Sequence, residues 1–425
     1  MRAFVAVDRR LVLAANTLTS RSSMASARYI YADSLLRRKG PSVTGQNVED
    51  RVRRRPKDRK QQILAHARDL FVEQGYHNVT MGAIASRVGI GPSALYRHFA
   101  NKAVLLEAVI EDSFGDIEFP ASGDIPLDEV IAEAASIAVA RPLGVLWSRE
   151  TRHLPPEVRE SLRERLRRSA EGYERLLRRD RPQLTAGQAE LLARAIQSVM
   201  ASPSYRSVRI PASTHVEVLI RAARAVAGAR MADIGAAGPS LASKGLSPVS
   251  RRERLLLAAS RLFAEQGYQE TSLDDIGSAA EVTGPNLYGY FENKAAVLRA
   301  VLERGTHSLW LDLDQALSRT SDPREALALL AHAYVSRFAA QPRMVHQLTG
   351  EVEIEERSVA YQREYVAEWV ALVRAVRPEL DQRDARHLVH IALSVADDLT
   401  TARHLASTEG FVADASAVVV AVLEA

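Results

Sequence analysis

Apolar residues recur at helical spacing along most of the chain. The earliest clear stretch places one group on a single helix face: Ile63, Leu64, Ala67, Leu70 and Phe71. Gly75 follows this stretch, and glycine commonly occupies the position after a last helical turn, so we expect the helix to end there. Beyond residue 126 the same spacing continues with short breaks, which predicts an all-α protein.

Three shorter helices are expected after Gly75. Thr80 can cap a helix that buries Met81, Ile84, Ala85 and Val88, and residues 89–91 form a break of three residues. Pro92 favours a first helical turn, and Leu95 and Phe99 would face inward from the helix that it starts. Asn101 can cap a fourth helix from Lys102. Two short helices joined by a tight turn form a helix-turn-helix, whose second helix enters the DNA major groove; a small helical core without function is the alternative reading.

The stretch 70–106 occurs twice. It recurs without a gap at 262–298, so Phe71, Gly75 and Tyr76 reappear as Phe263, Gly267 and Tyr268, each 192 residues further on. Self-similarity at this long period indicates a repeated domain rather than a solenoid, whose units run about 20–50 residues.

The recurring pattern resembles the DNA-binding domain of the TetR family of transcriptional repressors. The residues of the resemblance are Phe71, Gly75, Thr80, Ile84, Ala85, Gly89, Leu95, Tyr96, Phe99, Asn101 and Lys102. It covers roughly residues 53–113 and 251–304. The resemblance implies a helical ligand-binding domain after each helix-turn-helix, and dimerisation through a four-helix bundle of the last two helices. We expect those last helices at residues 184–200 and 215–229 in the first unit and at residues 387–405 and 411–423 in the second. Plain core packing of those helices is the alternative.

The resulting architecture is all-α, with two tandem TetR-like units. We expect a disordered basic leader (1–52), a first helix-turn-helix domain (53–113), a first helical regulatory domain (114–230), a linker (231–250), a second helix-turn-helix domain (251–304) and a second regulatory domain (305–425). The Gly-, Ala- and Ser-rich composition of 231–250 is typical of a flexible linker.

Candidate DNA contacts lie off the buried edge of the second and third helices and in the basic run before the first. In the first copy they are Arg55, Lys57, Thr80, Pro92, Ser93, Tyr96, Arg97, His98 and Lys102. In the second copy they are Ser272, Thr283, Asn286, Tyr288, Tyr290 and Lys294. The resemblance implies that positions such as Thr80, Tyr96, His98 and Lys102 contact phosphate, and that the start of the third helix meets bases.

The second copy departs from the first where DNA would lie. Glu281 stands in place of Gly89 and would strain the turn if a positive φ is required there. Gly289 and Tyr290 replace Arg97 and His98. Acidic residues also gather near this face: Asp274, Asp275, Glu281 and Glu292. Because carboxylates repel phosphates, we expect the first copy to bind DNA more strongly.

Charge is distributed unevenly along the chain. Residues 1–60 hold 15 Lys and Arg against 5 Asp and Glu, whereas residues 231–425 hold 19 against 27. A basic arm before near-neutral and acidic bodies favours a local nucleic-acid contact, with a solvated charge run as the alternative. The chain has no cysteine, which excludes disulfides and thiolate chemistry, and no apolar run approaches the roughly 18–20 residues of a membrane span. A cytoplasmic location is expected.

Aromatic and thioether side chains could line a ligand cavity in each regulatory domain, although such residues more often form the core. The candidates are Trp147, Tyr173, Met200, Trp310, Tyr334, Phe338, Tyr361 and Trp369. No catalytic motif, cofactor or metal site is predicted, since His387 and His390 lack a third ligand nearby.

The chain is therefore interpreted as a DNA-binding regulator, a repressor released by an unknown small molecule, working as a homodimer or as a pseudo-dimer within one chain. The alternative is a ligand-sensing or protein-binding scaffold in which one or both DNA readers, as we call the two helix-turn-helix units, are degenerate.

Overall fold

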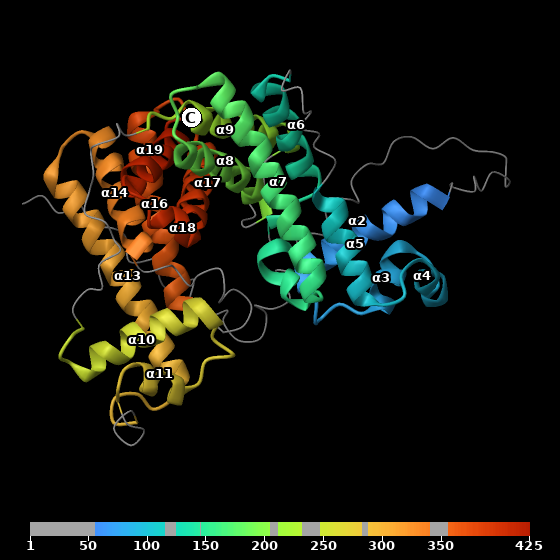
Figure 1. The fold of residues 1–425 in the computed structure, drawn as a ribbon, viewed down its shortest axis with the longest axis horizontal. Coiled ribbons are helices and arrows are strands. Elements are labelled where there is room, and N and C mark those ends of the chain that lie inside the picture. The colour runs from blue at the N-terminus through green and yellow to red at the C-terminus, as the bar shows by residue number, and fades with distance from the viewer. Residues whose placement is uncertain are drawn as a thin grey trace, which may run out of the picture. The chain divides into compact units, whose positions relative to one another are not determined.

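The computed structural model describes residues 56–114, 125–144, 146–204, 211–231, 247–282, 288–340 and 356–425. Within these ranges every regular element is helical and no strand occurs (Figure 1). The predicted leader, Arg55, Thr283, Asn286 and most of the predicted linker lie outside them. We call residues 56–231 the first half and residues 247–425 the second half.

The first half consists of α2 (Pro56–Gln74), α3 (Met81–Val88), α4 (Pro92–His98), α5 (Lys102–Phe114), α6 (Leu127–Ala140), the turns η1 (Leu146–Glu150) and η2 (Thr151–His153), α7 (Pro156–Asp180), α8 (Ala186–Ala201), the turn η3 (Ser202–Ser204) and α9 (Ala212–Gly228). The second half consists of α10 (Arg251–Gln266), α11 (Leu273–Ala279), α13 (Lys294–Arg319), α14 (Pro323–Ala340), α16 (Glu356–Val376), α17 (Gln382–Thr401), α18 (Arg403–Ala406) and α19 (Phe411–Leu423).

Local sequence sets the helix ends of the first helix-turn-helix unit. The Thr80 hydroxyl accepts the Ala83 N–H at 3.1 Å, which caps α3 as predicted. Asn101 Oδ1 accepts the Val104 N–H at 2.9 Å and so caps α5, also as predicted. Gly75 follows α2 with φ +79°, a backbone conformation that favours glycine.

The repeat continues beyond the helix-turn-helix units, with the spacing widened to 196 residues. Arg181 follows α7 and Arg377 follows α16, and each is followed by a proline. The Arg181 guanidinium donates to the carbonyls of Ala227 and Ala229 at 2.6 and 2.9 Å, beside the end of α9. Arg377 donates to the carbonyls of Glu424 and Ala425 beside the end of α19, the second at 2.8 Å. In each half, therefore, an arginine guanidinium holds the end of the last helix through hydrogen bonds to two backbone carbonyls.

The last helices of the two halves pack together. α8 and α9 of the first half contact α17 and α19 of the second half, and their apolar side chains share one hydrophobic core (Figure 1). Leu192 and Leu388, which are equivalent at the 196-residue spacing, are both fully buried in it. These four helices, α8, α9, α17 and α19, are called the bundle below.

Two further properties concern the described residues as a whole. None of their helices combines the length and the apolar content needed to cross a lipid bilayer. Nowhere among them do three or more His, Cys, Asp or Glu side chains gather in a way that would hold a metal ion.

Candidate nucleic-acid interface

The first helix-turn-helix presents α4 with one face anchored and the other open. Leu95 is fully buried and Phe99, directly after the helix, is 3% exposed, so both lock α4 onto α2 and α3. Gly89 adopts φ +74° after α3, and Gly91 precedes Pro92 in extended backbone. The turn therefore relies on one glycine with a positive φ, as the short break between the helices requires.

The open face of α4 carries the predicted contacts of the first copy. Pro92, Ser93, Arg97 and His98 are exposed, and Tyr96 is 52% exposed. Thr80 is exposed at the start of α3, with its hydroxyl engaged in the cap. Lys57 lies in the first turn of α2, but its side chain is outside the described part of the structure, as is Arg55.

Lys102 has a different environment from the one expected for a phosphate contact. Its ammonium donates to the carbonyls of Tyr76 and Val79 at 2.7 and 2.9 Å and lies 4.3 Å from the centre of the Tyr76 ring. Burial lowers the pKa of Lys102, and the nearby Glu150 carboxylate opposes that shift. At most one of its three N–H bonds is left for phosphate, so its main partners are internal.

Lys294 repeats this arrangement in the second copy. Its ammonium donates to the carbonyls of Tyr268 and Gln269 at 2.8 and 3.2 Å and lies 4.4 Å from the centre of the Tyr268 ring. In both copies, therefore, this lysine connects the start of a helix, α5 or α13, to the turn that follows the first helix of the same copy, α2 or α10. We call this contact the lysine staple.

The second reader differs from the first in backbone. Glu281 adopts φ +55°, the only non-glycine residue with positive φ in the described ranges. The positive φ on which the predicted strain depends is therefore present, and an L-residue with a side chain is disfavoured there. Tyr288 and Tyr290 are exposed but lie in a turn, whereas Tyr96 and His98 at the equivalent places lie in α4.

The start of α11 is acidic. Ser272 and Asp275 form a reciprocal capping box, in which the Asp275 N–H donates to the Ser272 hydroxyl at 3.1 Å and Asp275 accepts from the Ser272 backbone. The hydrogen bond from the Ser272 hydroxyl lowers the pKa of Asp275, which keeps the carboxylate charged. Asp274 is exposed beside it. This helix start is stable locally but carries the charge that DNA repels.

A buried carboxylate connects the first helix-turn-helix to the regulatory helices. Glu150 is 1% exposed, accepts the Tyr76 N–H at 3.2 Å and lies 3.7 Å from His153 Nε2. The His153 ring stacks on Tyr76 with centroids 4.9 Å apart. Sequence analysis did not identify this contact, because Glu150 and Tyr76 are 74 positions apart and share no local pattern.

The predicted pocket residues have different environments. Tyr173, Tyr334 and Trp369 are at most 2% exposed, so they pack in the hydrophobic core, and the Tyr334 hydroxyl donates to Asp397 at 2.7 Å. Trp147 packs against the core of the first helix-turn-helix, and Met200 packs against the bundle core. These five residues therefore pack in or against the hydrophobic cores, as the alternative given in the sequence analysis expects.

The other three candidates line a cavity of about 320 Å³ in the second half. Trp310, Phe338 and Tyr361 form part of its wall, together with apolar residues of α10 and α13 such as Leu256 and Val301. The Trp310 indole N–H has no hydrogen-bond partner in the described structure. The volume lies in the range of small-molecule sites, which run roughly 300–1,000 Å³.

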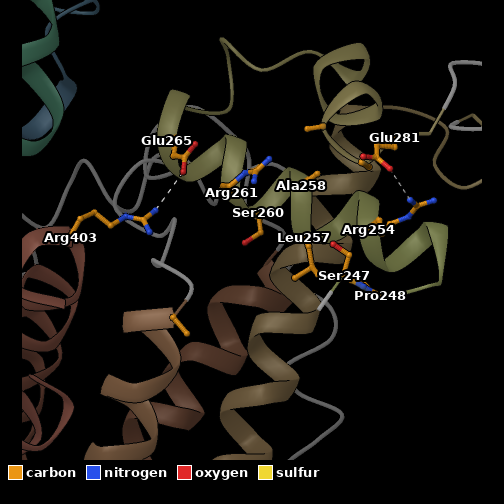
Figure 2. A pocket seen from close by; sticks show the side chains of 13 residues that line it. Ser247, Pro248, Arg254, Leu257, Ala258, Ser260, Arg261, Glu265, Glu281 and Arg403 are labelled. Carbon is orange, nitrogen blue, oxygen red and sulfur yellow. Dashed lines mark ion pairs between the residues drawn. The ribbon is translucent and has the colours of Figure 1, made fainter. Parts of the chain in front are cut away.

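A second cavity, of about 370 Å³, is more polar (Figure 2). Three arginines, Arg254, Arg261 and Arg403, contribute to its lining. Two of them are paired, Arg254 with Glu281 and Arg403 with Glu265, each at 3.6 Å. Because α18 supplies Arg403 and α10 supplies Glu265, this ion pair connects the end of the bundle to the first helix of the second reader.

Comparison with known proteins identifies both readers. The profile described as "Bacterial regulatory proteins, tetR family" matches residues 63–109 and 255–301. The chain is 38% identical over 84 residues to the HTH-type transcriptional activator FasR of Mycolicibacterium smegmatis, which covers 20% of this chain and 38% of that protein. It is 44% identical over 48 residues to the HTH-type transcriptional regulator UidR of Escherichia coli, covering 11% of this chain and 24% of that protein. The similarity thus spans less than two fifths of either relative.

Solved structures also resemble part of the chain. A TetR-family transcriptional regulator from Bordetella parapertussis aligns over 36% of this chain and 84% of its own, with 27% identity and a TM-score of 0.34. The fatty acid degradation regulator FadR from Bacillus halodurans aligns over 42% of this chain and 97% of its own, with 20% identity and a TM-score of 0.32. The units at residues 63–109 and 255–301 belong to the TetR family of bacterial regulatory proteins, and the chain carries this family's helix-turn-helix domain twice.

Proposed function

We propose that this protein is a DNA-binding transcriptional regulator whose first reader supplies most of the affinity. The observation that carries the proposal is the exposed face of α4. This face presents Tyr96, Arg97 and His98, while the buried Leu95 anchors the helix from its other side. α4 would lie in the major groove with Pro92 and Ser93 towards the base edges. Arg97 and His98 would meet the phosphates, which position the protein without reading sequence.

The test is binding to duplex DNA from the region of the protein's own gene, measured by fluorescence anisotropy at several salt concentrations. Arg97→Ala should weaken binding about fivefold or more and reduce the salt slope by about one, because one phosphate contact is lost. Arg178→Ala is the matched control, since Arg178 is an exposed arginine in the last turn of α7, where Leu177 packs in the core of the bundle and not in that of the first reader. Equal affinities for Arg97→Ala and the unmodified protein would refute this use of α4.

We further propose that the two halves act as a pseudo-dimer within one chain. The supporting observation is the bundle, in which α8 and α9 meet α17 and α19 of the same chain. The regulator would then present two different readers and favour an operator with unlike half-sites. In the alternative arrangement two chains pair and only their first readers contact DNA. Light scattering of the protein with and without duplex would distinguish one chain from two on the DNA.

The regulator is proposed to be a repressor that a small molecule releases from its operator. The supporting feature is the apolar cavity beside Trp310 and Phe338, whose wall includes α10 of the second reader. A ligand held there would act by favouring one position of α10 over another. Trp310 fluorescence and DNA affinity should therefore change together when an effector is added. FasR is named an activator, so a reporter assay should determine whether loss of binding raises or lowers transcription.

A second candidate function follows from the second reader. The acidic start of α11, the strained Glu281 and the turn at 288–290 suit a unit that has lost DNA binding and kept a structural or protein-binding role. The two possibilities differ in one measurement: footprinting on the bound operator should protect two half-sites if both readers engage, and one if the second does not.

A further inference from the structure

The interface between the halves is the part of the molecule that offers the most contacts for a further inference. Most of its apolar positions are alike on both sides, as the equivalent residues Leu192 and Leu388 illustrate. An apolar core of this kind would join two first halves, or two second halves, as well as it joins a first half to a second half. We call the former like pairs and the latter the unlike pair. Which half is selected must therefore depend on the polar contacts around that core.

A pseudo-twofold axis passes near Ser198. Its hydroxyl donates to the carbonyl of Ser394 at 3.2 Å, and these two residues are equivalent at the 196-residue spacing. In a twofold interface, a residue meets its own equivalent only close to the axis. The contacts that a like-half pair would make can therefore be read from this one by exchanging equivalent residues.

Two further polar contacts from α8 are made by Gln188 and Arg194. Gln188 Nε2 donates to Asp414 Oδ2 at 3.2 Å. Arg194 Nη2 donates to Asp398 Oδ1 at 3.1 Å, and Nε of the same arginine lies 3.1 Å from Oδ2. Each contact occurs once, whereas a symmetric dimer would contain each twice.

Two ring contacts add to this asymmetry. His404 Nε2 lies 2.6 Å from Glu190 Oε1, which joins α18 to α8. The rings of His215 on α9 and His387 on α17 meet edge to face with centroids 4.6 Å apart. The residue equivalent to His387 in the first half is Leu191, so this ring pair is also made once.

Two second halves would meet with unfavourable charges at two of the three exchanged contacts, whereas His390, the equivalent of Arg194, would face Asp398. Asp384 is the equivalent of Gln188, so two carboxylates, Asp384 and Asp414, would face each other where an amide now donates to Asp414. Arg386 is the equivalent of Glu190, so the imidazole of His404 would meet a cation in place of a carboxylate. Both unfavourable contacts would occur twice in the symmetric pair.

Two first halves would lose partners instead. Arg194 would meet Ser202, the equivalent of Asp398, and its charge would have no carboxylate there. Gln188 would meet Val218, the equivalent of Asp414. A buried or half-buried polar group without a partner is disfavoured, so this pair is weaker as well.

We propose that the bundle is a half-selective interface: the polar contacts from Gln188, Glu190 and Arg194 make the second half the preferred partner of the first, and they disfavour pairing between like halves. The proposal deepens the pseudo-dimer of unlike halves put forward above, and it holds whether those halves come from one chain or two and whether or not the protein binds DNA. Its partner is the other half of this chain, recognised by Asp398, Asp414 and His404.

The test is to cut the folded full-length chain at a protease site placed within residues 232–246 and to identify the particles by native mass spectrometry. A light batch and a heavy-isotope batch are mixed after cutting and held until light and heavy halves have exchanged, so that the pairs form anew and every pairing has its own mass. We expect pairs of one first and one second half to outnumber like pairs by roughly tenfold, the ratio expected for the combined loss of several ion pairs. Like pairs at the statistical 1:2:1 ratio, or halves that separate at micromolar concentration, would overturn the proposal.

Charge variants show whether the named side chains cause the selection. Asp384→Asn with Arg386→Gln removes the conflict between second halves and should raise the share of second-half pairs. Arg194→Glu should reduce unlike pairs, and adding Asp398→Arg should restore them. Glu217→Gln, at an exposed position of α9, is the control and should change nothing. If the control changes the shares as much as the test variants, the selection does not come from these contacts.

The outcomes for this proposal and for the proposed function are separate. An uncut protein that has the mass of two chains, and still gives only unlike pairs after cutting, would support half-selection and contradict the one-chain arrangement. Loss of DNA binding alone would leave the pairing result unchanged.

Discussion

At the scale of single residues, one backbone position distinguishes the two copies. Gly89 and Glu281 are equivalent, and both adopt a positive φ, +74° and +55°. In both copies the next amide closes the turn, Ile90 to Ala85 at 3.0 Å and Val282 to Gly277 at 2.9 Å. The second copy therefore keeps the turn of the first with a residue that is unfavourable in it.

Replacing Glu281 with glycine should relieve this strain. We expect Glu281→Gly to stabilise the turn by about 1 kcal/mol, since a left-handed conformation disfavours residues with a Cβ by about that amount. The Arg254 ion pair that is lost is exposed and contributes little. Hydrogen exchange at the Val282 amide measures the gain. Gly89→Glu makes the reverse substitution in the first copy and should speed hydrogen exchange at the Ile90 amide. If exchange is unchanged in both variants, the backbone at Glu281 is not strained.

The lysine staple makes a second residue-scale prediction. Lys102→Met and Lys294→Met should each destabilise their own helix-turn-helix by about 1–3 kcal/mol, because each removes a charged donor from two carbonyls. Faster hydrogen exchange in the segment between the first two helices of the same copy is the readout. Lys60→Met is the control, since Lys60 is exposed and lies 5.9 Å from the Phe99 ring centre. Unchanged exchange in both staple variants would show that the contact is not structural.

How far sequence could predict the site depends on the distance between partners in the chain. The caps at Thr80 and Asn101 were predictable, because each capping oxygen and the backbone N–H that donates to it lie three residues apart. The internal partners of Lys102 were not, since they lie 23 and 26 residues away and are backbone carbonyls with no sequence signature. The role of Glu150 depends on a contact over 74 residues.

At the scale of elements, apolar periodicity predicted the helices better than it predicted their ends. α19 has the expected bounds, Phe411–Leu423, because nearly all of its residues are apolar. The preceding helix was expected from His387 to Leu405, but α17 runs from Gln382 to Thr401. Its first turn is polar and is fixed by the Asp381 side chain, which accepts from two backbone N–H groups. A polar turn of this kind has no apolar period to reveal it.

The acidic start of α11 gives a prediction for the second reader. Asp274→Asn should strengthen DNA binding by about twofold to fivefold at low salt if this reader approaches the phosphates, because one repulsive charge is removed. Anisotropy titrations at 50 and 200 mM salt would show the gain shrinking with salt. Asp314→Asn on α13 is the matched control. An unchanged affinity for Asp274→Asn would indicate that the second reader stays off the DNA.

At the scale of the whole molecule, the bundle should respond to pH. Burial lowers the pKa of His387 to about 4, with the neighbouring His215 adding to the shift, and burial also lowers the pKa of His215. An unfolded histidine has a pKa near 6.5, so the unfolded chain binds more protons between about pH 6.5 and 4. The stability contributed by the neutral rings is complete above about pH 6.5 and is lost as the pH falls towards 4.

The loss should reach at most about 3 kcal/mol for His387. Melting temperatures measured between pH 7.5 and 4.5 test it. His387→Leu, which introduces the residue found at the equivalent Leu191, should flatten the dependence. His332→Gln, at an exposed position of α14, should leave the dependence as it is. A slope that persists in His387→Leu would place the titrating group elsewhere.

The contact of Ser198 with its own equivalent, Ser394, has a consequence for how such a protein can change over time. In a dimer of identical chains every substitution enters twice, so an improvement on one side brings the same alteration to the other. When the two sides are different segments of one chain, a substitution changes only one of them, and that side can diverge while the other is conserved. Arginine and histidine in α4, beside glycine and tyrosine at 289 and 290, are the kind of divergence that this freedom permits.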